Sequence, residues 1–427
     1  MEQISLLHWL KKEQALNDEW YDCLRFELDK HIYYYGNHFK RPLESIQTDK
    51  KEKAKYELKR FAAKTKGRFS KKQFDKSKPV VISNAYFNFN EELSAADVHV
   101  IQPPWVVNLD SWKYYDADLI SLCVKIKKLF AFAPFNYLIS KEFINVLEEF
   151  SRKLRSFILE KKISALVVPN DESFFENISI KIFKELGFPT FFFLHGLPGG
   201  YNSVDGNRSD YLIVWGKKFK ELYIRNGISE KKIFVSGHPS YKNSTNGRLR
   251  FSFENILVLT KTIAGSPHSD GAILSDRGNL IVYLRSIQKV LQKMDVKQVR
   301  LRPHPSENIE WYMKFLDKDF FTPDPESLTN SLNKSSLVIG SVSSVFLEAL
   351  FYNVNYLVYE PMYNGKNILN LSLAPPFDGT DNRIPVAYDE ESLLKFLCEK
   401  KCVDTQLLPD YIQMPFDISF IKPLLKK

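Results

Sequence analysis

A histidine held between two prolines is the residue pattern in this sequence that most suggests chemistry. Arg302, Pro303, His304 and Pro305 follow one another directly after a strand-like segment. The prolines stiffen the backbone on either side of His304, and an imidazole aimed in this way can donate to a phosphate oxygen and stabilise a departing nucleotide. The pattern predicts a phosphate contact at His304, with Pro305 fixing its approach. Arg302 either supports that phosphate or caps a helix.

A run of serines is the second candidate phosphate site. In SLVIGSVSSVFLEAL, residues 336–350, an apolar strand is followed by Ser341, Ser343 and Ser344 at the start of an apolar helix. Free backbone N–H groups and serine hydroxyls at a helix start make a cradle for phosphate. Plain N-capping by Ser341 or Ser343 is the alternative. Glu348 either accepts hydrogen bonds from ribose hydroxyls or is a surface charge.

These candidates lie within an alternation of short apolar segments and amphipathic segments. Apolar runs predict buried strands, and apolar residues at helical spacing predict helices. The strands expected in the first half of the chain are at 79–87, 97–107, 163–171, 188–196, 209–216 and 231–239. The helices expected there include 140–162 and 173–187. Such an alternation is typical of parallel βαβ units in a doubly wound α/β sheet.

A polar, turn-rich stretch at 240–254 marks a domain boundary. We therefore expect one Rossmann-like domain at 1–245 and a second at 246–427. Segment 335–361 has the order strand, tight turn, helix, strand. Two such domains enclose a cleft, and open α/β sheets bind ligands at the carboxyl ends of their strands. The carboxyl-terminal helix, at 391–403 or beyond, is a candidate to cross back to the first domain.

Length and composition set the broad class of protein. The 427 residues favour two domains, and 44% of them are hydrophobic, which is enough for two cores. No apolar run reaches the ~18 residues that a membrane-spanning helix needs. The amino terminus lacks a secretory apolar region, so we expect a cytoplasmic protein. The cysteines lack metal-binding spacing and are expected to be reduced thiols: Cys23, Cys123, Cys398 and Cys402.

Positive charge is concentrated in one segment. The formal net charge is +9, and residues 49–78 form a dense basic block in which Phe61, Phe69 and Phe74 are interleaved. The block is either a solvated face or a contact surface for an anionic polymer or the inner face of the cytoplasmic membrane. No zinc-finger, KH or RRM signature accompanies it, so we do not expect a nucleic-acid partner.

The order of these motifs resembles a known family. His304-Pro305, followed by Ser343-Ser344 and the EAL of residues 348–350, is similar to the carboxyl-terminal half of certain bacterial GT-B glycosyltransferases. These enzymes use CMP-activated nonulosonic acids or Kdo, and include sialyltransferases, polysialyltransferases and the Kdo transferases of capsule and lipopolysaccharide assembly. The resemblance implies a GT-B fold, in which His304, Ser343 and Ser344 hold the CMP phosphate.

A second family shares the pattern in part. CDP-glycerol and CDP-ribitol transferases of teichoic acid synthesis are also similar, but their turn usually contains Asp-Tyr-Ser-Ser. Here Ser341-Val342 replaces Asp-Tyr, which favours a CMP-sugar donor. The resemblance covers mainly residues 255–361. A CDP-alditol or NDP-sugar donor stays an alternative, as does a non-catalytic scaffold in a glycan assembly complex.

The resemblance implies that the first domain holds the acceptor and a catalytic carboxylate. Asp171 and Glu172 stand at the end of the strand expected at 163–171. A carboxylate there could deprotonate an acceptor hydroxyl, attack an anomeric carbon, or simply cap the following helix. Ser173 follows where the paired-acid motif of sialyltransferases has glycine, and the identity of the base stays open.

Further contacts follow from the same resemblance. His195 and Gly196 end an apolar strand and either bind donor or acceptor or form a structural turn. Lys261, Thr262 and Gly265 are expected donor contacts, because the first loop of the second domain lies over the donor in GT-B enzymes.

No motif for a metal or for ATP hydrolysis is visible. No DxD motif stands at a strand end, and GxxxxGK[ST] does not occur. The leaving phosphate can be stabilised by His304 and backbone dipoles, so we expect neither a metal nor a cofactor. The resemblance implies transfer of a CMP-activated nonulosonic acid, such as sialic or pseudaminic acid, or of Kdo, to a glycan or glycolipid acceptor of the bacterial surface.

Overall fold

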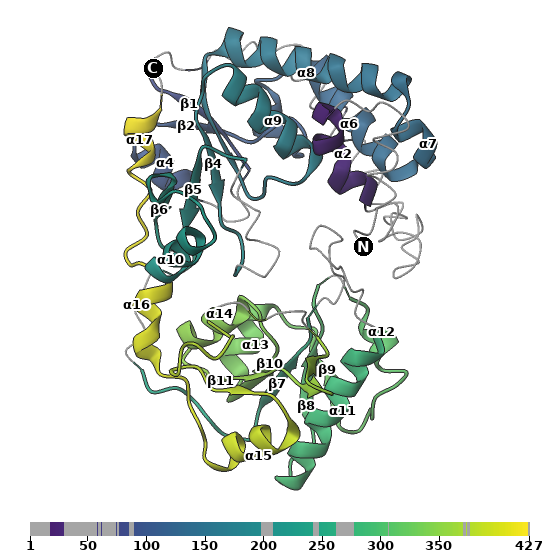
Figure 1. The fold of residues 1–427 in the computed structure, drawn as a ribbon, viewed down its shortest axis with the longest axis vertical. Coiled ribbons are helices and arrows are strands. Elements are labelled where there is room, and N and C mark those ends of the chain that lie inside the picture. The colour runs from purple at the N-terminus through teal and green to yellow at the C-terminus, as the bar shows by residue number, and fades with distance from the viewer. Residues whose placement is uncertain are drawn as a thin grey trace.

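The computed structural model contains two α/β domains, drawn one above the other in Figure 1. It describes residues 18–29, 58, 61, 74, 77–84, 89–197, 208–241, 247–261, 277–305, 307–369, 373 and 376–425.

The first domain is built on a parallel six-stranded sheet with the order β2-β1-β3-β4-β5-β6. Its strands are β1 Val80–Ser83, β2 His99–Ile101, β3 Ile163–Val168, β4 Thr190–Phe193, β5 Tyr211–Val214 and β6 Ile233–Val235. The strand expected at 97–107 stops at Ile101. Pro103 and Pro104 follow shortly after and have no N–H groups to extend the ladder.

Helices pack on both faces of this sheet (Figure 1). They are α2 Asp18–Asp29, α4 Asn90–Ala95, α5 Leu109–Trp112, α6 Ala117–Phe132, α7 Phe135–Leu138, α8 Lys141–Lys161, α9 Phe174–Glu185 and α10 Lys217–Arg225. The helices expected at 140–162 and 173–187 are confirmed as α8 and α9. Ser140 caps α8 by accepting from the Phe143 N–H, and Lys162 ends it with φ of 51°.

The second domain is built on another parallel six-stranded sheet, with the order β14-β11-β10-β7-β8-β9. Its strands are β7 Ile256–Leu259, β8 Val299–Arg302, β9 Phe321–Pro323, β10 Leu337–Gly340, β11 Tyr356–Tyr359 and β14 Val386–Ala387. The direction of winding changes between β7 and β10. In doubly wound sheets, this change creates a crevice where ligands bind.

Five helices and a small hairpin surround the second sheet within the described part of the chain. The helices are α11 Arg277–Lys293, α12 Ile309–Tyr312, α13 Leu328–Lys334, α14 Val345–Phe351 and α15 Glu390–Cys398. The antiparallel hairpin pairs β12 Met362–Tyr363 with β13 Lys366–Asn367. The strand, turn, helix, strand order expected at 335–361 is confirmed as β10, α14 and β11.

The end of the chain returns to the first domain. The returning segment contains a short 3₁₀ turn at Thr405–Leu407, α16 Leu408–Tyr411 and α17 Ile421–Leu424, which run along one side of the molecule in Figure 1. The Gln413 N–H donates to the Trp215 carbonyl at 2.8 Å, and Phe420 stacks on Phe234 at 4.5 Å. The crossing therefore starts after the helix named from the sequence, because α15 packs on α11 in the second domain.

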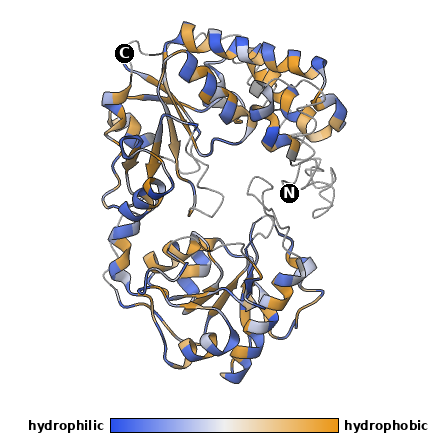
Figure 2. Ribbon diagram, viewed as in Figure 1, coloured by the Kyte–Doolittle hydropathy of each residue, from blue (hydrophilic) through white to orange (hydrophobic). Residues whose placement is uncertain are grey.

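Burial of apolar strands and helix faces stabilises both domains. Every residue of β3 is buried, and so are all residues of β4, β7, β10 and β11. Figure 2 shows α8 with one hydrophobic and one hydrophilic side, as its spacing predicts. Removing a large apolar side chain from water contributes about 1.5–3 kcal/mol. No helix in the described ranges combines the length and apolarity needed to cross a bilayer.

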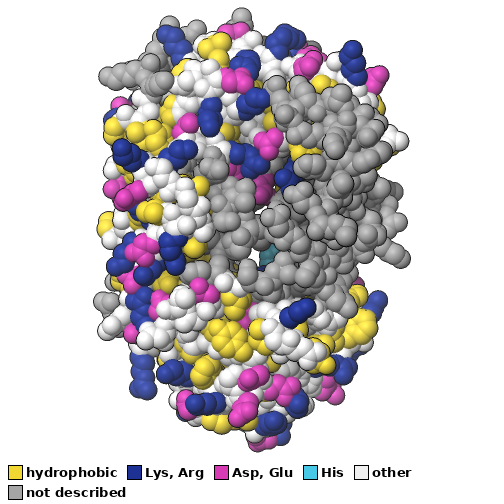
Figure 3. Space-filling view, viewed as in Figure 1, with side chains coloured by type: hydrophobic (Ala, Val, Ile, Leu, Met, Phe, Trp, Pro, Cys, Tyr) yellow, Lys and Arg dark blue, Asp and Glu magenta, His cyan; other side chains and the backbone are white. Residues whose placement is uncertain are grey.

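Two Rossmann-like domains with a returning carboxyl-terminal segment form the GT-B architecture predicted from the sequence. In Figure 3, charged side chains of both signs are scattered over the described surface of both domains. The carboxyl ends of the central strands of the two sheets face each other in Figure 1. Groups that follow these strands are therefore the ones able to meet a ligand between the domains.

Candidate functional site

The predicted phosphate contacts of the second domain follow three neighbouring strands. Lys261 comes after β7, His304 after β8, and the serine turn of residues 341–344 after β10. Neighbouring strands are about 4.8 Å apart, so the strands that carry His304 and the serine turn lie about 10 Å apart with β7 between them. The winding order therefore brings these motifs to one edge of the sheet.

A closed set of hydrogen bonds holds the backbone at His304. The His304 N–H donates to Thr260 Oγ1 at 3.0 Å, and that hydroxyl donates to Glu307 Oε2 at 3.0 Å. The Glu307 N–H donates back to the His304 carbonyl at 2.8 Å, and the Tyr312 hydroxyl donates to the same Glu307 carboxylate. Thr260 and Glu307 were not identified from the sequence, because no local motif marks them.

The imidazole of His304 is exposed beyond this anchored backbone, as is Pro305. Partial burial lowers the pKa of His304 below its usual value. The ring is therefore neutral near pH 7, and a neutral imidazole can donate one hydrogen bond to a phosphate oxygen.

Ser341 faces the protein interior. Its side chain is 2% exposed, and its hydroxyl donates to Glu360 Oε1 at 2.5 Å. The Val342 N–H donates to the same oxygen at 2.6 Å, and the Tyr356 hydroxyl donates to the Ser341 carbonyl at 2.6 Å. Ser341 is thus part of the support of the turn, and its hydroxyl points away from the position of a ligand.

Ser343 and Ser344 remain half-exposed at the start of α14. Ser343 Oγ accepts from the Val345 N–H at 3.2 Å, which is the capping role left open by the sequence. The Ser344 side chain makes no capping hydrogen bond. These two serines are the part of the turn able to meet a ligand.

Lys261 brings a positive charge behind the serine turn. Burial lowers the pKa of its ammonium group, and the Glu360 carboxylate acts in the opposite direction. The Glu360 carboxylate thus favours the charged form of Lys261. Two further predicted donor contacts, Thr262 and Gly265, lie outside the described residues.

Arg302 and Glu348 approach each other beside this site. The Arg302 guanidinium donates to the Glu326 carbonyl at 2.5 Å and to Ser331 Oγ at 3.4 Å, so it ties β8 to the region of α13. Burial raises the pKa of Glu348, and Arg302 partly offsets that effect. Arg302 thus makes structural contacts, and Glu348 is a half-buried carboxylate near it.

Asp171 in the first domain is a buried anchor. Its side chain is 0% exposed, Oδ2 accepts from the Arg208 N–H at 3.1 Å, and the Arg208 guanidinium lies 4.0 Å from Oδ1. Arg208 also pairs with Asp22 of α2 at 3.1 Å. These contacts tie the segment before β5 to the end of β3.

The N-cap residue of α9 is Ser173, whose side chain makes no capping hydrogen bond, and Asn170 holds the turn that precedes the helix. Asn170 Oδ1 accepts from the Glu172 N–H at 3.3 Å and from the Ser173 N–H at 3.0 Å. Glu172 itself is half-exposed. Its carboxylate is near enough to His195 to raise the pKa of that ring, although burial of the ring is the larger effect and lowers it.

His195 has a defined tautomer when its ring is neutral. Nδ1 lies 2.7 Å from the Pro169 carbonyl oxygen, which can only accept, so Nδ1 carries the hydrogen and Nε2 is the acceptor nitrogen. The side chain is exposed after the end of β4, and the next residue, Gly196, has open space where a side chain would be. A neutral imidazole with an accepting Nε2 is suited to removing a proton from a hydroxyl.

A second polar cluster of the first domain was missed from the sequence. Glu176 Oε1 accepts from Asn84 Nδ2 at 2.9 Å and from Trp105 Nε1 at 3.0 Å, and Lys127 Nζ donates to the Trp105 carbonyl at 2.7 Å. Burial raises the pKa of Glu176. The cluster lies beyond β1 and β3, where the winding of the first sheet changes direction; Trp105 and Glu176 are buried, whereas Asn84 is half-exposed and Lys127 is exposed.

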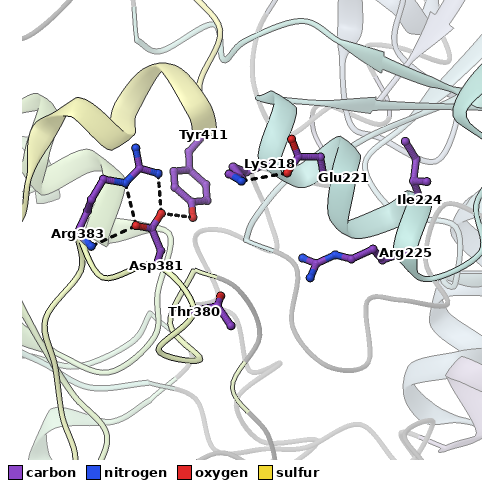
Figure 4. Close-up of a pocket in the computed structure, with 8 residues that line it drawn as sticks. All are labelled: Lys218, Glu221, Ile224, Arg225, Thr380, Asp381, Arg383 and Tyr411. Carbon is purple, nitrogen blue, oxygen red and sulfur yellow. Dashed lines mark hydrogen bonds and ion pairs between the residues drawn. The ribbon is translucent and has the colours of Figure 1, made fainter.

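Figure 4 shows a pocket of about 640 Å³ between α10 and the returning segment. It contains none of the residues predicted from the sequence. Beside it, Asp410 pairs with Lys217 of the first domain at 2.5 Å and with Arg383 of the second at 2.8 Å. The Tyr411 hydroxyl donates to Asp381 at 2.9 Å. We regard this region as the joint between the domains.

No group of three or more histidine, cysteine, aspartate or glutamate side chains suited to a metal occurs among the residues with described positions.

No protein-family model matches the chain, and no curated protein matches its sequence. Solved structures resemble it at low identity. The UDP-GlcNAc 2-epimerase from Neisseria meningitidis bound to UDP-GlcNAc is 11% identical, with 82% of this chain and 99% of that chain covered, at a TM-score of 0.43. The lipopolysaccharide outer core galactosyltransferase WaaB is 11% identical, covering 81% and 97%, at 0.41. The wall teichoic acid polymerase TagF is 11% identical, covering 90% and 96%, at 0.37. At these values the likeness is one of overall fold.

Proposed function

We propose that this protein is a glycosyltransferase that moves a CMP-activated nonulosonic acid or Kdo onto a bacterial surface glycan. The observation that carries the proposal is the edge of the second sheet, where His304, Lys261 and the serine turn occupy adjoining strand ends. Thr260 connects the first two through its hydrogen bond to the His304 N–H, and Glu360 connects Lys261 to the turn.

The donor phosphate would lie against this edge. Ser343 and Ser344 offer hydroxyls and backbone N–H groups, and Lys261 offers positive charge. As the bond between the anomeric carbon and the phosphate oxygen breaks, that oxygen gains negative charge. His304 would donate a hydrogen bond to the departing CMP phosphate at this stage.

The acceptor would approach from the first domain, where we assign the general base to His195. Asp171 is buried and engaged with Arg208, whereas His195 is exposed and its Nε2 is the accepting nitrogen. His195 would take the acceptor proton as the new glycosidic bond forms, and the nearby Glu172 would stabilise the resulting imidazolium. The products are the glycosylated acceptor, CMP and one proton.

The preference for a CMP-activated donor comes from the family resemblance alone, since Ser341-Val342 stands where the similar CDP-alditol transferases usually have Asp-Tyr. A CDP-alditol or NDP-sugar donor would use the same phosphate contacts, and a scaffold would use none of them. Thermal unfolding with CMP, CDP and UDP separates these alternatives. We expect CMP to raise the unfolding temperature selectively. Selective stabilisation by CDP or UDP would support another donor, and no response to any nucleotide would contradict the enzyme assignment.

We propose that transfer needs neither a metal nor a cofactor, since His304, Lys261 and backbone N–H groups can offset the charge of the leaving phosphate. CMP release from a CMP-sugar in the presence of an acceptor should persist in excess EDTA. Loss of release in EDTA, with recovery on adding Mg²⁺, would contradict this point.

We also propose that the protein works at the inner face of the cytoplasmic membrane through the basic segment 49–78. Most of this segment lies outside the described residues. Leu58 and Phe61 are 74% and 72% exposed, whereas Phe74 stacks on Tyr114 at 4.5 Å and belongs to the first domain. Each basic residue near an anionic surface contributes about 1 kcal/mol of binding.

Co-sedimentation with anionic liposomes tests the membrane contact. We expect the Leu58→Ser/Phe61→Ser variant to bind less than the wild-type protein does. Tyr363→Ser removes an aromatic side chain of the second domain that is 71% exposed, and it serves as the matched control. Equal binding by wild-type protein and both variants would refute the contact.

A further inference from the structure

A buried carboxylate stands directly behind the serine turn. Glu360 follows β11, is 0% exposed, and contacts the turn through Oε1, which accepts from the Ser341 hydroxyl at 2.5 Å and from the Val342 N–H at 2.6 Å. Glu360 is not among the residues named from the sequence, and it takes no part in the proposed reaction itself. A carboxylate is costly to bury unless donors satisfy its oxygens, so its presence needs a physical reason.

The orientation of this carboxylate is fixed from its other side. Asn367 Nδ2 donates to Glu360 Oε2 at 2.9 Å, while Asn367 Oδ1 accepts from the Leu369 N–H at 2.7 Å. The Asn367 amide therefore cannot reverse without losing both bonds. Because the side chain of Asn367 is held by the backbone after β13, each oxygen of Glu360 has a set position relative to the turn.

The turn is clamped from two directions as a result. Glu360 holds the Ser341 hydroxyl and the Val342 N–H, and the Tyr356 hydroxyl holds the Ser341 carbonyl at 2.6 Å. The space behind the turn is full, since a Cβ on Gly340 would lie 2.1 Å from the Tyr356 hydroxyl. With these groups fixed, the residues that follow in the chain, Ser343 and Ser344, have little freedom in where they begin α14.

Charge gives Glu360 a second effect on the same site. Lys261 follows β7, which is separated from β11 by β10, and the Glu360 carboxylate favours the charged form of its ammonium group against the effect of burial. A neutral side chain at position 360 would leave Lys261 without this support. The carboxylate thus acts both on the geometry of the serine turn and on the cation beside it.

We propose that Glu360 is a positioning residue of the donor site, which sets the serine turn and Lys261 for a phosphate without touching the phosphate itself. The inference rests on the proposed function, because it concerns the same nucleotide site. It goes further by naming the buried group on which the affinity of that site depends.

Binding of CMP to Glu360→Gln and Ser341→Ala tests the inference. Gln keeps an accepting oxygen for the turn but removes the charge and places an NH₂ group against the Asn367 amide. Ser341→Ala removes one bond to the turn and is the milder change. Since a hydrogen bond to a charged group contributes enough to alter binding by about tenfold, we expect Glu360→Gln to weaken CMP binding by about that factor and Ser341→Ala to weaken it by less.

Asn355→Ala is the matched control for loss of stability. Asn355 is also 0% exposed, stands at the opposite, amino end of β11, and holds Val403 N–H and the Lys401 carbonyl. It should lower the temperature of unfolding without changing the CMP dissociation constant of the folded protein.

A double-mutant cycle distinguishes a positioning role of Glu360 from a purely structural one. Glu360→Gln combined with Ser343→Ala should weaken CMP binding by less than the product of the single effects, because both act on one turn. Asn355→Ala combined with Ser343→Ala should give the product. Wild-type protein that binds none of CMP, CDP and UDP would overturn the proposed function and this inference with it. Wild-type binding of CMP, with equal affinity in Glu360→Gln and Ser341→Ala, would overturn the inference alone.

Discussion

The carboxyl edges of the two sheets are built differently. In the second domain, buried groups such as Thr260 and Glu360 hold backbone turns, and these turns present His304 and Ser343 at the surface. In the first domain, the corresponding edge carries a polar cluster around the buried Glu176, and His195 is exposed at the end of β4. Under the proposed function, a charged donor is held by several fixed groups of the second domain. An acceptor hydroxyl needs mainly one general base from the first domain.

Replacing His195, the proposed general base, is the strongest test of this difference between the two domains. His195→Asn should lower the turnover number by roughly a hundredfold to ten-thousandfold, the usual contribution of a general base, while CMP still binds. Measurement of CMP release and of CMP affinity on the same preparation separates the two effects. Full turnover in His195→Asn would return the role of base to a carboxylate, with Glu172 tested next.

Replacing His304, at the carboxyl edge of the second sheet, should affect both CMP binding and turnover. His304→Ala loses a hydrogen bond to the phosphate, and we expect CMP to bind about tenfold more weakly, with a comparable loss of turnover at saturating donor. Calorimetric titration with CMP and assays of CMP release measure the two. Glu310→Gln is the control, because it alters an exposed side chain of α12, six residues further along the chain, and leaves the imidazole. Unchanged affinity and turnover in His304→Ala would remove this residue from the site.

Replacing Asp171 tests whether this buried carboxylate of the first domain contributes to stability and not to catalysis. Asp171→Asn should lower the free energy of unfolding by about 1–3 kcal/mol, because a buried acceptor of the Arg208 N–H and its charge are weakened. The folded fraction should still turn over. Urea unfolding measures the stability change, and Glu172→Gln, at a half-exposed neighbour, should stay within about 0.5 kcal/mol of wild type. Loss of turnover without loss of stability would instead make Asp171 catalytic.

The pH dependence of the rate reports the base of the first domain. Burial lowers the pKa of His195 below 6.5, and only the neutral ring can accept a proton. The rate should therefore fall as pH drops through that lowered pKa and be level around pH 7 to 8. A profile of turnover against pH at saturating donor tests this, with His195→Asn as the variant that should lose the acidic limb.

The smallest effect concerns His238, which packs against Trp215 and is 2% exposed. Burial lowers the pKa of His238 to about 3. The unfolded chain binds a proton near pH 6.5 and the folded chain does not, so stability present above pH 6.5 is lost as pH falls toward 3. The slope from this group is at most about 1.4 kcal/mol per pH unit. Urea unfolding at pH 7 and pH 5 should show a smaller pH effect in His238→Gln than in wild type.

Local patterns were enough to predict most of the framework. The apolar run of β10, the serine turn and α14 follow one another within a short stretch, and the capping choice at Ser343 was among the alternatives that the sequence left open. His304 and Ser344 were also named from their neighbours in the chain, and their role in a donor site stays a prediction. The helix α6 was not predicted, because its apolar residues are distributed around much of its surface and give weak periodicity.

The sequence by itself determined where strands and helices form and which short motifs end them, because spacing of apolar residues and turn chemistry act between near neighbours. Only the tertiary structure decided that Ser341 faces inward, that Asp171 is buried against Arg208, and that Glu360 supports the turn. Each of these outcomes depends on partners far apart in the chain. Such partners meet only through the order of strands in a sheet, and no local pattern encodes that order.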